Sequence, residues 1–184
     1  MEHLTTAQLE AGVDRIRRSP ADQGRVELIV RRPAVDEREV LPQAALDTVD
    51  GLVGDTWPVR GSRRTPDGSA HPDMQLNVMN ARAAALVAVQ PERWQLAGDQ
   101  LYVDLDLSVG NLPAGTRLAL GSAVIEITAQ PHLGCDKFLK RFGKDALRFV
   151  NSPTGRELRL RGVNARVVVP GTVRVGDTIR KVAA

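Results

Sequence analysis

Short strand-like segments that end at glycine or proline constrain the fold of this chain most strongly. Val26, Leu28 and Val30 recur at every second position before Pro33, and such a period indicates a strand with one buried face. We predict further strands over residues 35–40, 74–79, 101–106, 116–120, 123–128, 163–169 and 172–175. Many short strands with few helices predict a mostly β, α+β domain with a barrel-like sheet.

Turn and cap signals place the remaining elements. Thr5 with Gln8 forms a capping box for a helix over 6–18, and Asn80 is an N-cap for a helix over 81–89. Residues 26–30 and 35–40 predict a hairpin, as do the two strands that flank Gly121-Ser122. We also expect a helical turn over 44–46, a mobile loop over 58–73 and a turn over 152–155. The boundaries predicted are an N-terminal helix and lead-in over 1–24 and one barrel domain over 25–184.

Composition limits the classes of protein. Of 184 residues, 42% are hydrophobic and 26% are charged, which suits one well-buried core. No apolar run approaches the roughly 18 residues that a bilayer requires, and the N-terminus lacks the apolar centre of a signal peptide. We therefore expect a cytoplasmic protein without a membrane segment. The single cysteine excludes an internal disulfide and zinc sites built from cysteine pairs.

Positive charge is concentrated in one part of the chain. Residues 136–166 carry nine Lys or Arg against three acids, a local charge of +6 in a chain of net charge +3. This asymmetry favours an anionic small molecule, a phosphate or an acidic partner surface, with a solvated basic face as the alternative. Aromatic residues make up only 3% and no nucleic-acid reader motif is present, so we do not expect a nucleic-acid partner.

Cys135 is the first candidate for chemistry. It follows His132-Leu133-Gly134 and precedes Lys137, at the point where a helix is predicted to begin. The positive end of a helix dipole and nearby lysines both favour a thiolate. The alternative is that Cys135 packs as a small buried hydrophobe, because free cysteines are often buried.

Other candidates are weaker. His132 stands at a metal-ligand spacing from Cys135 but cannot complete a zinc site alone; we expect it to hydrogen-bond near the thiolate or substrate, with an ordinary loop histidine as the alternative. Asn77, Asp99 and Gln100 are candidates to line a pocket, with a turn residue as the alternative for Asp99. The cations that could hold an anionic ligand are Arg60, Arg63, Arg64, Lys137, Arg161 and Arg166.

Several motifs occur in a fixed order: GLVGD at 51–55, AGDQLYVDLDL at 97–107, LPAGTRLALGSAVIEIT at 112–128, HLGCDKF at 132–138 and RGVNARVVVPGTVRVGD at 161–177. As a set they resemble the MOSC domain family over about residues 25–182. The resemblance implies a β-barrel-like fold and a cysteine that either carries sulfur as a persulfide or ligates molybdenum in a molybdopterin cofactor. The positions that match are Cys135, Lys137 with Phe138, Arg161-Gly162 and Gly176-Asp177.

The resemblance leaves three functions open. Cys135 binds molybdenum of the cofactor, and the protein reduces N-hydroxylated or N-oxygenated substrates; or Cys135 is a sulfur carrier; or the barrel is a non-catalytic binder of an anion or a protein. The chain shows no aminotransferase-like domain that uses pyridoxal phosphate and no ferredoxin-like or flavin domain. We therefore expect a separate cysteine desulfurase or a separate electron donor as partner.

Overall fold

The computed structural model describes residues 3–183 and contains a closed β-barrel. The strands follow in the order β11-β7-β8-β9-β5-β6-β1, and β11 pairs with β1 as well as with β7, which closes the sheet. Only β5 and β6 run parallel; the other pairs are antiparallel. The barrel strands are β1 (Gln23–Arg31), β5 (Leu76–Asn80), β6 (Leu101–Asp104), β7 (Arg117–Leu120), β8 (Ala123–Ile127), β9 (Val163–Val169) and β11 (Thr178–Val182). The predicted α+β barrel is confirmed.

The side chains that point inward from these strands fill the barrel. Inward side chains form one apolar cluster in which Ile29, Leu101, Leu118, Ile125 and Ile179 are fully buried. Successive residues of a strand point to opposite faces, so the same strands present other side chains outward. A closed barrel also removes the unpaired edges that an open sheet would expose.

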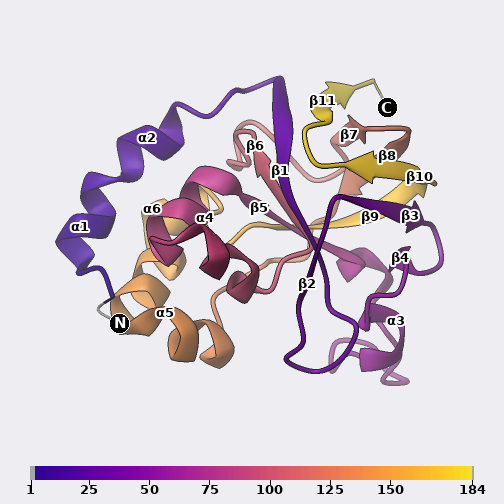
Figure 1. Ribbon diagram of the computed structural model, residues 1–184, viewed down its shortest axis with the longest axis horizontal. Coiled ribbons are helices and arrows are strands. Elements are labelled where there is room, and N and C mark those ends of the chain that lie inside the picture. Colours follow the sequence, from indigo (N-terminus) through magenta and orange to yellow (C-terminus); the bar gives the residue numbers. More distant parts are fainter. Residues whose placement is uncertain (1–2, 184) are drawn as a thin grey trace.

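A layer of helices covers one side of the barrel (Figure 1). A second apolar cluster joins Val30 and Tyr102 of the barrel wall to Leu9, Phe138 and Phe142 of the helices. Full burial of one such side chain contributes about 1.5–3 kcal/mol to stability. The helical elements are α1 (Thr6–Ala11), α2 (Val13–Arg17), α4 (Ala81–Ala88), η2 (Pro91–Ala97), α5 (Asp136–Asn151) and α6 (Pro153–Glu157).

A smaller sheet lies beside the barrel, away from these helices (Figure 1). It has the order β10-β3-β4, formed by β3 (Gln43–Asp47), β4 (Gly51–Leu52) and β10 (Gly171–Arg174). The β1–β2 hairpin, with β2 (Glu39–Leu41), leads into it, and α3 (Trp57–Arg60) and η1 (Pro72–Met74) follow it.

Some local predictions were wrong. Residues 44–46 form strand β3 and no helical turn, because pairing with β10 buries Ala44 and Leu46 and overrides the helix preference of alanine. The turn predicted over 152–155 contains the start of α6, where the Ser152 hydroxyl accepts from Gly155 N at 2.9 Å. The first helix divides into α1 and α2 at Gly12. Strand β11 was not predicted.

Candidate functional site

Cys135 lies at the surface at the start of α5. It is the N-cap residue of that helix with extended backbone (φ −124°, ψ 179°), and its side chain makes no capping hydrogen bond. The thiol is exposed, so the alternative of a buried packing role is wrong for this cysteine. An exposed sulfur at the positive end of a helix is free to react or to bind an external group.

The loop that carries Cys135 is held at two points. The Nε2 of His132 lies 3.0 Å from Asp99 Oδ1. Two residues further on, Gly134 N donates to Asn151 Oδ1 at 2.9 Å, and Asn151 Nδ2 donates to Gly134 O at 3.2 Å. Asn151 is the last residue of α5, and a kink at Gly143 (φ 86°, ψ 172°) interrupts this helix. The two hydrogen bonds therefore tie the loop before Cys135 to the end of the helix that follows it.

Asp99 is the buried centre of the first polar network. It is fully buried and accepts from Arg161 Nη1 at 2.6 Å, while Arg161 Nη2 donates to Ala97 O at 2.9 Å and the guanidinium lies 5.2 Å from the centre of the Phe138 ring. Burial disfavours the charged carboxylate, but Arg161 and His132 together outweigh it and lower the pKa of Asp99.

These contacts set the protonation of His132. Burial, reinforced by the charge of Arg161, lowers the pKa of His132 despite the opposing effect of Asp99. The ring is therefore neutral near neutral pH. An ionised carboxylate can only accept, so Nε2 carries the proton and donates to Asp99, which leaves Nδ1 as an acceptor.

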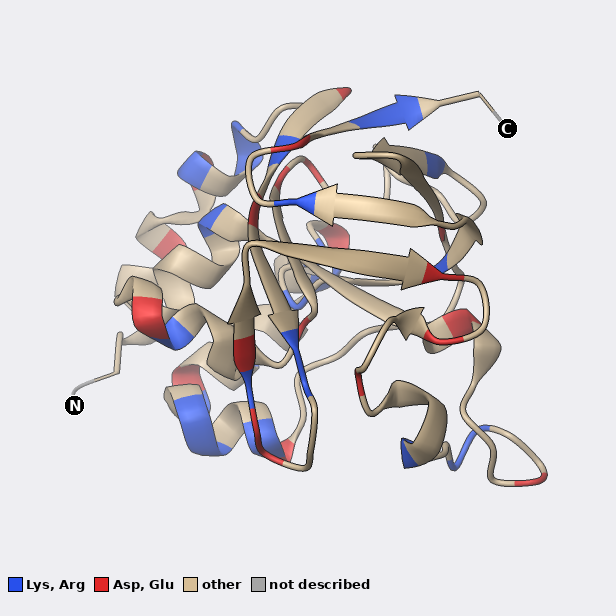
Figure 2. Ribbon diagram, turned by 45° about the vertical axis from the view of Figure 1, so that its right-hand side comes forward, with Lys and Arg blue, Asp and Glu red and all other residues tan. Residues whose placement is uncertain are grey.

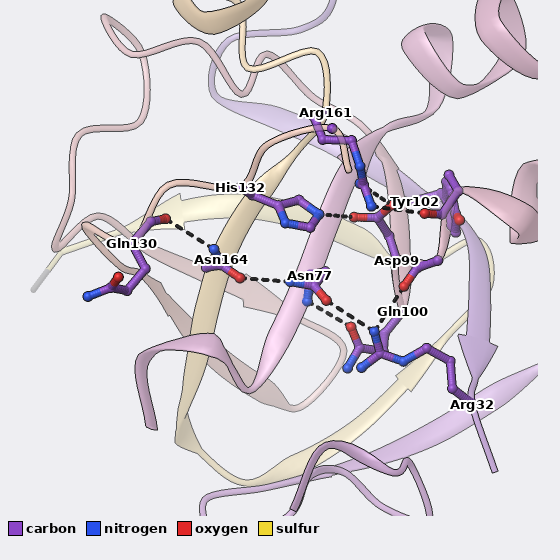
Figure 3. A network of polar contacts seen from close by, with 12 residues as sticks. Arg32, Asn77, Asp99, Gln100, Tyr102, Gln130, His132, Arg161 and Asn164 are labelled. Carbon is purple, nitrogen blue, oxygen red and sulfur yellow. Dashed lines mark hydrogen bonds and ion pairs between the residues drawn. The ribbon is translucent and has the colours of Figure 1, made fainter. Parts of the chain in front are cut away.

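A second polar network runs alongside the first (Figure 3). Arg32 forms a bidentate pair with Asp55 (2.7 and 2.8 Å) and also donates to Asn77 Oδ1 and to Gly98 O. Asn77 Nδ2 donates to Asn164 Oδ1 at 2.7 Å, and Asn164 Nδ2 donates to Gln130 O. Gly98 directly precedes Asp99, so the two networks meet at residues 98–99.

A cationic pocket lies next to the start of α5. Its volume is about 180 Å³, and it is lined by Arg32, Arg38, Arg60 and Lys137 together with exposed Val35 and Val59. The single acid in its lining, Asp36, binds Lys137 and Arg141 at 3.0 Å each. Burial, followed by the nearby charges of Arg141 and Arg32, lowers the pKa of Arg38. Crowded cations at a concave surface favour an anionic ligand.

The structure brings together only part of the predicted cation set. Lys137 and Arg60 line the pocket, whereas Arg161 is absent from its lining and pairs with Asp99. Arg64 donates to Gln130 Oε1 at 3.1 Å, and Arg63 is an exposed residue of the loop. Arg166 pairs with Glu126 and Asp73 and does not line the pocket.

Two pocket arginines, Arg32 and Arg38, were missed. The signal was the Arg31-Arg32-Pro33 sequence, where a strand ends in charge, but the alternation of Val26, Leu28 and Val30 gave no reason to select Arg32. Asn77 and Gln100, the candidates to line a pocket, are buried, and their side chains bind other protein groups. Within residues 3–183, no group of three or more His, Cys, Asp or Glu side chains could hold a metal ion.

The fold and the site define a small mixed β-barrel with one exposed thiol at the start of a basic helix. The chain belongs to the MOSC domain family, whose model matches residues 67–180. This family is associated with the molybdenum cofactor and with sulfur-related functions. The earlier resemblance is thereby confirmed at the level of the family.

Solved structures agree on the fold. The YuaD protein from Bacillus subtilis has a TM-score of 0.63 and 15% identity, covering 85% of this chain and 94% of its own. YiiM from Escherichia coli has a TM-score of 0.55 and 22% identity, covering 87% and 70%. YiiM from Geobacillus stearothermophilus has a TM-score of 0.53 and 13% identity, covering 87% and 73%. No curated protein matches the chain. Among residues 3–183, no helix has the length and apolar character needed to cross a membrane.

Proposed function

We propose that this chain binds the molybdenum cofactor, with the Cys135 thiolate as the protein ligand of molybdenum. The observation that carries the proposal is the exposed thiol of Cys135 two residues before Lys137, which lines a pocket with three arginines. A soft thiolate suits molybdenum that is already bound to the sulfur atoms of a pterin. The family association of the chain supports the same group.

The cationic pocket suits the anionic end of the cofactor. At about 180 Å³ it is smaller than the roughly 300 Å³ of sites that enclose a whole small molecule, but it can receive a phosphate group. Arg32 is already neutralised by Asp55, and Lys137 shares Asp36 with Arg141, so Arg38 and Arg60 are the main residues that would hold the phosphate, and Lys137 would contribute from its surface pair. Arginine and lysine both bind phosphate oxygens through charge-assisted hydrogen bonds.

The bound molybdenum would supply two-electron reduction of an N-hydroxylated or N-oxygenated substrate, with electrons from a separate donor protein. The contribution of the chain is to position the thiol. Asp99 and Asn151 hold the loop that leads into Cys135, through His132 and Gly134, which keeps the ligand in place when the surroundings are exposed to water. Preorganised support of this kind is what a metal ligand requires.

Metal analysis tests this proposal. Protein made in a host that produces the cofactor should contain near-stoichiometric molybdenum and pterin, and Cys135→Ser should lose the metal. Arg60→Met should retain less cofactor than wild type, while the matched change Arg174→Met on exposed β10 should retain the wild-type amount. Wild-type protein with no more molybdenum than Cys135→Ser would contradict the proposal.

A second function, sulfur transfer, is favoured by the exposure of Cys135. A carrier thiol must be reachable by a cysteine desulfurase that uses pyridoxal phosphate, and the surface position of the sulfur meets that need. Mass spectrometry after incubation with a desulfurase and cysteine separates the two functions. A persulfide on Cys135 in protein that never acquires molybdenum would select the carrier.

A further inference from the structure

A second cavity borders the loop that leads into Cys135 and shares no lining residue with the cationic pocket. It has a volume of about 450 Å³ and is bounded by His132 and Leu133 of the loop, Val163 of β9 and Arg156 of α6. Neither Cys135 nor Lys137 lines it, so it is distinct from the site proposed for the cofactor. Its size falls in the range of sites that enclose a small organic molecule, about 300–1,000 Å³.

The walls of this cavity are apolar and its only charges are positive. Val109, Leu133, Val150 and Val163 supply apolar surface, Arg156 and Arg159 supply two guanidinium groups, and none of the described residues in the lining is acidic. Apolar walls with a small number of charged groups are typical of sites for small ligands. The lining therefore fits an apolar molecule that carries an anionic group.

Of the two arginines, Arg159 has the more unusual backbone conformation and surroundings. Its backbone has φ +49°, a conformation that is uncommon for a residue with a side chain. Its Nη1 donates to Leu112 O at 2.6 Å, and burial lowers the pKa of its guanidinium. Arg159 is partly exposed and lines the cavity, and among residues 3–183 no carboxylate forms an ion pair with it, so its guanidinium lacks a counter-charge. A ligand anion would supply that charge.

His132 adds a neutral hydrogen-bond acceptor to the same wall. Its Nε2–H is held by Asp99, and its Nδ1 has no hydrogen-bond partner within the described part of the chain. His132 lines the cavity, so the tautomer fixed by Asp99 leaves the site with one acceptor nitrogen beside two cations. The set can accept a hydrogen bond from a ligand and donate hydrogen bonds to its anionic group.

We propose that this cavity binds a small organic carboxylate with an apolar body, held by Arg159 and Arg156 against the valine-rich wall and His132. The site does not depend on the cofactor or on Cys135. Benzoate is a suitable probe because it has one carboxylate on a flat apolar ring. Benzamide has the same shape without the charge, and inorganic phosphate has charge without the apolar body.

Nuclear magnetic resonance of isotope-labelled full-length protein tests the site. Benzoate should bind saturably with a Kd of about 1 mM or lower and should shift the signals of His132, Val109 and Val163. Benzamide and phosphate should each bind about tenfold more weakly or worse, since a charge-assisted hydrogen bond and apolar burial each contribute that factor. Equal binding of benzamide, or shifts elsewhere in the protein, would overturn the proposal.

Variants separate the site from its surroundings. Arg159→Met should weaken benzoate binding by about tenfold or more, and thermal unfolding shows whether it remains folded. Arg156→Met, at an exposed position, provides the second variant if Arg159→Met is unstable. The control Arg148→Met removes an exposed cation of α5 outside the cavity and should leave binding unchanged, as should Cys135→Ser. Wild-type affinity in both Arg159→Met and Arg156→Met would refute the site.

Discussion

His132 Nε2 and Asp99 Oδ1 lie 3.0 Å apart and connect the loop of Cys135 to a carboxylate that is fully buried. Asp99 in turn neutralises Arg161, which packs over Phe138 of α5. The barrel core, the helix and the reactive loop are therefore joined through one side chain. Figure 2 shows Lys and Arg positions on the helices that cover one side of the barrel.

Asp99→Asn should destabilise the protein strongly. The change leaves the Arg161 guanidinium, which is 5% exposed, without its counter-charge, and loss of one partner of a buried pair costs about 3–5 kcal/mol. Urea unfolding of both proteins measures the difference. The control Asp36→Asn removes an acid from a surface pair with Lys137 and should leave the free energy of unfolding near that of wild type.

The stability should depend on pH through His132. Its pKa is lower in the folded protein than the usual value of about 6.5, so the unfolded chain binds the proton first as the pH falls. The contribution of His132 to the free energy of unfolding is therefore fully present above about pH 6.5, and the free energy of unfolding decreases as the pH falls below that value. Urea unfolding between pH 5 and 7.5 measures this slope.

Two histidine variants test whether His132 causes this pH dependence of stability. His132→Gln should be less stable at neutral pH and should lose the dependence between pH 5 and 6.5. His71→Gln serves as the control, because His71 is a partly buried cap of η1 without a carboxylate partner in the described residues, and it should keep the dependence. An unchanged slope in His132→Gln would assign the effect to another group.

Sequence periodicity predicted the barrel because segments that match six of its seven strands were recognised in the sequence, and such segments can satisfy their backbone hydrogen bonds only by pairing. Periodicity failed for strands that form only because a strand distant in the sequence pairs with them. Ala44 and Leu46 show no helical or strand preference strong enough to reveal β3, which forms because β10 provides a partner. Strand β11 carries Arg180 and Lys181 among its apolar residues, and its two-sided pairing with β1 and β7 depends on the closure of the barrel.

The site was predicted in part for a similar reason. Cys135, His132 and Lys137 are close in sequence, so one motif was sufficient to select them. Arg32 and Arg38 reach the same region from the β1–β2 hairpin, about 100 residues earlier in the chain. No local pattern relates a hairpin to a distant helix; only the fold places them together. The role of Asp99 as a buried ion-pair centre likewise depends on Arg161, which lies 62 positions later.

Asn151→Ala should loosen the loop of Cys135 without changing the fold. It removes both hydrogen bonds to Gly134, and an amide N–H without its partner costs about 1–3 kcal/mol. We expect faster hydrogen exchange over residues 131–135 and a smaller fraction of bound molybdenum in the cofactor-competent host. Asn111→Ala removes an amide that binds backbone carbonyls elsewhere and should leave exchange in this loop unaltered.

The charge around Cys135 should control which reagents reach it. Lys137, Lys140 and Lys144 are exposed on α5, the helix that begins after Cys135. A cluster of positive charges raises the local concentration of anions. A doubly anionic aromatic disulfide should therefore react with Cys135 faster at low salt than at high salt, because salt screens the attraction beyond about 10 Å at 0.1 M. A neutral dipyridyl disulfide should show little salt dependence. Stopped-flow absorbance measures both rates.

Charge reversal on α5 completes this test. Lys140→Glu should slow the anionic disulfide several-fold at low salt and leave the neutral reagent unchanged, since only the electrostatic attraction differs. Arg174→Glu, an exposed change on β10, is the control and should affect both reagents equally little. If Lys140→Glu slowed the two reagents by the same factor, the cause would be a change in the exposure of Cys135, and the proposed field around the thiol would be wrong.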